Sequence, residues 1–71
     1  MNYDEILAVL RYAGDHECPV RIVTSTSTEV TGVPTSLDTH LTAHEVYLRP
    51  EASDDTEIAL SLAAIREVAL V

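Results

Sequence analysis

"EIALSLAAIREVALV", residues 57–71, is the stretch that decides the fold, and it fits two structures. If the segment forms strands, the apolar side chains alternate along two runs that the Ala63-Ala64 turn separates, namely Ile58, Leu60 and Leu62, then Val68 and Leu70. If it forms a helix, one apolar stripe contains Ile58, Leu62, Ile65 and Ala69. Intrinsic propensity favours the helix because Ala, Leu and Glu are strong helix formers. The residues of this segment alone leave both structures open.

The beginning of the chain predicts a helix over about residues 2–13. Asn2 is a good N-cap, and Glu5 stands three residues later, as in a capping box. The apolar residues of this segment recur at helical spacing, at Tyr3, Ile6, Leu7, Leu10 and Ala13. Gly14 is expected to supply the left-handed residue that ends the helix.

The middle of the chain predicts three strands. "PVRIVTS", residues 19–25, is rich in β-branched residues, and a turn is expected at Ser25 to Thr28. "EVTGVPTSL", residues 29–37, predicts a bent strand, because Gly32 marks a close approach or a bend and Pro34 cannot donate to a ladder. "HEVYLR" alternates as a third strand, and the acidic "PEASDDT" that follows it is expected to be a loop.

The length and composition favour one small domain, residues 1–71. A domain of this size hides only about 60% of its unfolded surface, so it usually needs disulfides, a metal or self-association. Cys18 is the single cysteine, and no paired-cysteine metal pattern is present, which leaves association. The first residues lack an apolar signal-like run, and no segment approaches the roughly 20 apolar residues of a membrane span. We therefore expect a cytoplasmic protein.

The charge limits the range of partners. Twelve acidic residues stand against four arginines, and the formal net charge is −8. Because Lys and Arg supply most of the non-specific affinity for phosphate backbones, any contact with RNA is expected to be local and to involve few residues. The acidity either solvates the surface or docks on a basic partner.

A helix followed by five strands, with a bent second strand that contains Gly32, resembles the Sm-like small barrel of the Sm, LSm and Hfq proteins. Residues 32–42 resemble the first Sm motif, in which Leu37, Asp38, His40, Leu41 and Thr42 align without a gap. The ending from Ile58 to Leu70 resembles the last two strands of that family, which a one-turn connection joins. The resemblance implies a mainly β fold, with the helix over about residues 2–13 and a strongly bent five-stranded barrel over about residues 19–71. The alternative is an α+β domain with a C-terminal helix at residues 57–68.

The resemblance also implies a function. In the Sm pattern, the loop that corresponds to residues 38–42 holds a base of single-stranded RNA: His40 would stack on it, Thr42 would bond its edge, and Asp38 would brace the loop. The implied protein is a non-catalytic homo-oligomer, a ring or a dimer. The chain departs from the family where Thr42 replaces an asparagine and where Ser61-Leu62 replaces an Arg-Gly pair.

A second resemblance implies a basic protein as the partner instead of RNA. The early Tyr3-Asp4 pair, Glu45 to Leu48 and the acidic loop resemble the Rof family of small acidic inhibitors of the Rho terminator. That resemblance implies docking on a basic protein, with Asp54, Asp55 and Glu57 as contact residues. A structural oligomer without any role in nucleic-acid binding is the third alternative.

We do not expect catalysis, a metal or a cofactor. His40 and His44 have the four-residue spacing of helical metal ligands but are expected in a loop, without a third ligand nearby. Cys18 is expected to be a small, buried residue, because a catalytic cysteine needs a positioned base. Asp54 and Asp55 are adjacent, so their side chains diverge.

Overall fold

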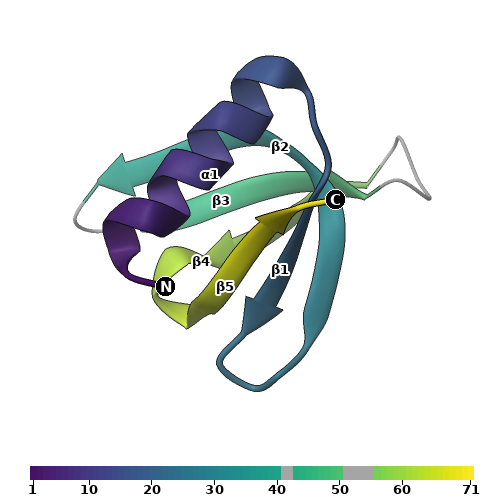
Figure 1. The fold of residues 1–71 in the computed structure, drawn as a ribbon. Coiled ribbons are helices and arrows are strands. Elements are labelled where there is room, and N and C mark those ends of the chain that lie inside the picture. Colours follow the sequence, from purple (N-terminus) through teal and green to yellow (C-terminus); the bar gives the residue numbers. More distant parts are fainter. Residues whose placement is uncertain (41–42, 51–55) are drawn as a thin grey trace.

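The computed structural model describes residues 1–40, 43–50 and 56–71, which form one helix and one antiparallel sheet (Figure 1). The elements follow in the order α1 (Tyr3–His16), β1 (Val20–Thr24), β2 (Glu29–His40), β3 (Ala43–Pro50), β4 (Ile58–Ser61), the 3-10 turn η1 (Leu62–Ala64) and β5 (Ile65–Leu70). The strand order in the sheet is β4-β3-β2-β1-β5. The prediction of a mainly β fold with an N-terminal helix is therefore confirmed.

The sheet is bent but open, so the barrel that the resemblance implies does not close among the described residues. β4 and β5 are its two edges, and no ladder joins them among the residues that the structure describes. α1 lies across one face of the sheet (Figure 1). The buried apolar side chains come from α1, β1, β3, η1 and β5, and they are Ile6, Leu10, Ala13, Val20, Ile22, Val46, Leu48, Leu62, Ile65 and Val68. In the described parts of the chain, no helix is long and apolar enough to span a bilayer.

α1 begins where the sequence predicts and ends later. The Glu5 N–H donates to Asn2 Oδ1 at 2.8 Å, and the Asn2 N–H donates to Glu5 Oε1 at 3.2 Å, which completes the capping box. The left-handed residue that ends the helix is Glu17, with φ 52°, so the assignment of this role to Gly14 is wrong. Gly14 instead faces Pro34: a Cβ at this position would lie 3.6 Å from the Pro34 carbonyl oxygen.

The bend in β2 has two local causes, both at positions that the sequence predicts. Gly32 is paired with Pro50, and a Cβ on Gly32 would lie 2.7 Å from the Arg49 carbonyl oxygen. The register then shifts between Pro34 and Ser36. Because an irregularity of this kind bends a strand and increases its twist, β2 can contact both β1 and β3 while it curves.

The C-terminal segment forms two strands, as the resemblance implies, and not the alternative helix. Ile58 of β4 is paired with Leu48 of β3, and Val68 of β5 is paired with Ile22 of β1. η1 turns the chain between them, and the Ala64 carbonyl oxygen accepts a 2.8 Å hydrogen bond from the Ser25 N–H. Ladder bonds to two different strands therefore override the helical propensity of this segment.

Candidate functional site

The predicted base-binding residues lie at the end of a hairpin. Asp38 and His40 belong to β2, where they are paired with Glu45 and Ala43 of β3. We expected residues 38–42 and His44 to form a loop, and the structure corrects this for Asp38, His40 and His44, because the β2–β3 ladder continues to the His40–Ala43 pair. Residues two apart on a strand share one face of the sheet, so Asp38 and His40 point the same way. Thr42, the predicted edge-binding residue, lies outside the described residues.

Asp38 holds His40 through two contacts. One carboxylate oxygen of Asp38, Oδ1, accepts the backbone N–H of His40 at 3.0 Å and lies 2.6 Å from the ring atom Nδ1. These two bonds hold the pKa of Asp38 below its ordinary value, and the bond to the backbone N–H of His40 has the larger effect. Because an ionised carboxylate only accepts hydrogen bonds, Nδ1 must carry a proton and donate a hydrogen bond to Asp38. The pair therefore fixes both the tautomer and the orientation of the ring.

The ring of His40 is held in place and is also accessible. Its side chain is 84% exposed, whereas that of Asp38 is partly buried. With Nδ1 bonded to Asp38, Nε2 is left for a ligand. An exposed planar ring with a fixed orientation is a stacking platform for a nucleobase, and base–aromatic stacking tolerates every base because each has a π face. The resemblance implied that Asp38 braces the loop; in the structure, Asp38 contacts His40 itself, and a role in base binding stays a prediction.

A stacked pair of aromatic rings lies at the same end of the hairpin, and the sequence analysis did not find it. His44 of β3 is paired with Thr39, next to the His40–Ala43 pair. Its imidazole stacks with the ring of Tyr3 in the first turn of α1, with 5.8 Å between the centroids and 25° between the planes. This contact joins the start of α1 to the hairpin end that bears His40. No sequence signal indicates it, because Tyr3 and His44 are far apart in the chain.

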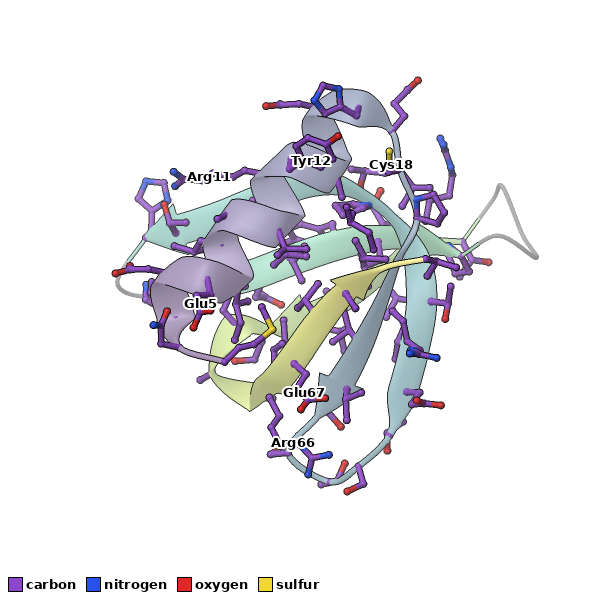
Figure 2. The ribbon with its side chains drawn as sticks, in the orientation of Figure 1. Glu5, Arg11, Tyr12, Cys18, Arg66 and Glu67 are labelled. Atoms are coloured by element: carbon purple, nitrogen blue, oxygen red, sulfur yellow. The ribbon has the colours of Figure 1, made fainter. Side chains whose placement is uncertain are left out.

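The electrostatics around this site are acidic. Glu45 is paired directly with Asp38 across the strands, so two acidic residues stand opposite each other near the hairpin end that bears His40. Two of the four arginines contact side chains outside this site. Arg21 lies 3.9 Å from Glu29, and Arg66 donates to the Ser27 hydroxyl at 3.5 Å. A third arginine, Arg11 of α1, extends towards the end of β2 (Figure 2).

The other predicted residues add little to this site. Asp54 and Asp55 lie outside the described residues, and Glu57 is exposed immediately before β4. Within residues 1–40, 43–50 and 56–71, no group of three or more His, Cys, Asp or Glu side chains could hold a metal ion. Cys18 is half-buried rather than buried, and its thiol donates to the His16 carbonyl oxygen at 3.6 Å.

A groove of about 200 Å³ lies between α1 and β2, away from the predicted residues. α1 contributes Leu10, Arg11, Gly14 and Asp15 to its wall, and β2 contributes residues 34–37. Gly14 lets α1 approach Pro34 at one point of this wall. Among the described residues, neither Asp38, His40 nor Glu57 lines the groove, although its wall reaches Leu37, the neighbour of Asp38.

No family model matches the chain, and neither a curated protein nor a solved structure matches it.

Proposed function

We propose that this protein is a non-catalytic, Sm-like protein that binds single-stranded RNA by stacking a base on His40. The observation that supports the proposal is the double contact of Asp38 Oδ1 with His40, through the backbone N–H at 3.0 Å and through Nδ1 at 2.6 Å. The bond to Nδ1 restricts an otherwise exposed ring before any ligand arrives. A preorganised group loses less conformational entropy on binding than a mobile one does.

The expected binding mode follows from the local charges. Stacking of one base on an aromatic ring contributes about 1–3 kcal/mol. Because Asp38 and Glu45 are paired on this hairpin and the chain has only four arginines, the phosphates should gain little, so affinity should fall only modestly as salt increases. Thr42 has one hydroxyl to offer to the base edge, which would give weaker base selection than an amide side chain gives.

Self-association is part of this proposal. β4 and β5 are both edge strands, and edges with unpaired N–H and C=O groups readily add another strand. A single His40 imidazole holds one base weakly, whereas a cyclic oligomer or a dimer presents several imidazoles to the same RNA. Linked binding events raise the overall affinity well above that of one site.

The experiment compares binding of a short uridine-rich or adenine-rich RNA at low salt, by fluorescence anisotropy, for the wild type and two variants. His40→Ala should weaken binding by about 5- to 150-fold for each base held, which corresponds to 1–3 kcal/mol. Asp38→Asn keeps the ring but removes the charged acceptor, so a smaller loss is expected. His16→Ala is the matched control, because His16 is an exposed histidine at the other end of α1.

Two outcomes would contradict the proposal. The first is that the wild type does not bind RNA even at low salt. The second is that His40→Ala and His16→Ala bind RNA equally well, which would show that any affinity does not depend on the ring.

The net charge of −8 favours a second candidate, an acidic module that docks on a basic protein. Asp54, Asp55 and Glu57 would then contact the partner, in the manner of the Rof-like alternative. Reversing these charges should weaken a complex with a basic nucleic-acid-binding protein mainly through its association rate, because long-range attraction acts before contact. RNA binding by the wild type and no effect of the charge reversals on such a complex would argue against this candidate.

A further inference from the structure

Residue 1 contacts the outer edge of β5. The Val68 N–H donates to the sulfur atom Sδ of Met1 at 3.3 Å, and the backbone nitrogen of Met1 lies 3.5 Å from the Arg66 carbonyl oxygen. The N mark in Figure 1 accordingly lies beside β5. These two contacts join residues that are more than sixty positions apart in the chain.

The geometry shows that Met1 occupies a position where another strand could pair. In the sheet, β5 has β1 on one side only. Successive residues of a strand direct their N–H groups to opposite edges, and an N–H that bonds Met1 cannot bond β1. The Val68 N–H is therefore a donor of the free edge, and a strand that added to β5 would use it.

We propose that Met1 is a displaceable cap on the β5 edge, which holds this edge closed against a second copy of the chain. A thioether sulfur is a weak acceptor, whereas an incoming strand offers a carbonyl oxygen to the same N–H. In the single molecule, Met1 therefore bonds the Val68 N–H, and at higher concentration a strand of a second copy replaces it. This inference rests on the self-association in the proposed function and does not depend on RNA binding.

A second copy is the partner that fits, because β4 is the other edge of the sheet in the described part of the chain. The end of the chain beside the β5 edge is also apolar and exposed: Leu70 is 51% exposed and Val71 is 72% exposed. A second copy could cover these side chains while its strand pairs with β5. Removal of the cap should then strengthen association without any change in the folded core.

The test replaces residue 1 in a chain that is released from a cleavable N-terminal fusion, so that position 1 can hold any residue. Met1→Ala removes the whole cap, and Met1→Leu keeps the bulk but removes the sulfur acceptor. Tyr12→Ala is the matched control, because Tyr12 is 51% exposed and Met1 is 49% exposed. Amide exchange of Val68 and Ala69 is measured in dilute, monomeric samples, and the association constant is measured by sedimentation velocity.

Both Met1 variants should accelerate exchange at Val68 by about twofold, the low end of the effect of losing one hydrogen bond because sulfur is a weak acceptor, with no change at Ala69. Met1→Ala should also raise the association constant above those of the wild type and Tyr12→Ala. Unchanged exchange at Val68 in either variant would overturn the cap. An unchanged association constant in Met1→Ala would overturn its role as a barrier to pairing, whether or not the protein binds RNA.

Discussion

Gly32 and Gly14 should respond in opposite ways to the same substitution, because their surroundings differ. A Cβ at Gly32 would lie 2.7 Å from the carbonyl oxygen and 3.1 Å from the carbonyl carbon of Arg49, and 3.3 Å from the Cα of Pro50. All three atoms are backbone atoms that the β2–β3 ladder holds in place. Gly32→Ala must therefore push the two strands apart, and overpacking of this kind costs about 1–3 kcal/mol of the free energy of unfolding.

Gly14→Ala is the matched control, because the same methyl group meets ordinary contacts there. Its Cβ would lie 3.6 Å from the Pro34 carbonyl oxygen and 3.9 Å from the Pro34 Cβ. Gly14 lies within α1, where alanine is favoured over glycine by about 0.5–1 kcal/mol, so this variant should gain stability.

The assay is urea unfolding followed by far-UV circular dichroism, with thermal melts as a second measure. For a domain of this size, 1 kcal/mol shifts Tm by about 4–8 °C, so Gly32→Ala should melt at least about 4 °C below the wild type and Gly14→Ala above it. If Gly32→Ala is as stable as the wild type, β2 and β3 do not approach each other as closely as described. If both variants lose stability equally, the difference in local packing has no effect.

Three further predictions concern the charge pair, the assembly and the salt dependence. His40→Ala should raise the pKa of Asp38 towards its ordinary value, as followed by NMR titration of the carboxyl carbon, because the side-chain bond is lost. Since the folded-state pKa of Asp38 is the lower one, its ionised form stabilises the fold at neutral pH, and this contribution should vanish as the pH falls below about 4 through the folded pKa. The stability difference between the wild type and Asp38→Asn should therefore disappear in acid, and a constant difference would contradict the assignment. Light scattering at micromolar concentration should give a mass several times 7.7 kDa, and a stable monomer would contradict self-association. RNA affinity should fall by less than about tenfold between 50 and 200 mM salt, and a steep fall would indicate phosphate contacts instead of stacking.

The sequence predicts most of the features that depend only on residues close together in the chain. Asn2 and Glu5 predict the start of α1 because a capping box depends only on residues three apart. Gly32 predicts the bend in β2, since a residue without a Cβ permits the approach of Arg49. The end of α1 was misassigned, because Glu17 adopts the left-handed conformation that glycine favours, while Gly14 lies within the helix and faces Pro34.

Features that depend on residues far apart in the chain could not be predicted from short stretches of sequence. Residues 57–71 have equally good strand and helix periodicity, and only the ladders to β1 and β3 distinguish the two structures. The continuation of the hairpin to His40 likewise depends on pairing with β3. The contacts of Tyr3 with His44 and of Met1 with Val68 join opposite parts of the chain, so no short motif encodes them. For the candidate site, the sequence singled out Asp38 and His40, and it gave no indication of the Tyr3–His44 contact.

The most direct test of base stacking on His40 is an NMR titration of the histidine ring signals with a short uridine-rich RNA at low salt. A base that stacks on a ring shifts its protons upfield through the ring current. The account predicts a clear upfield shift of the His40 ring signals, with those of His16 unchanged. Unmoved His40 signals at saturating RNA, or equal shifts of His40 and His16, would contradict it.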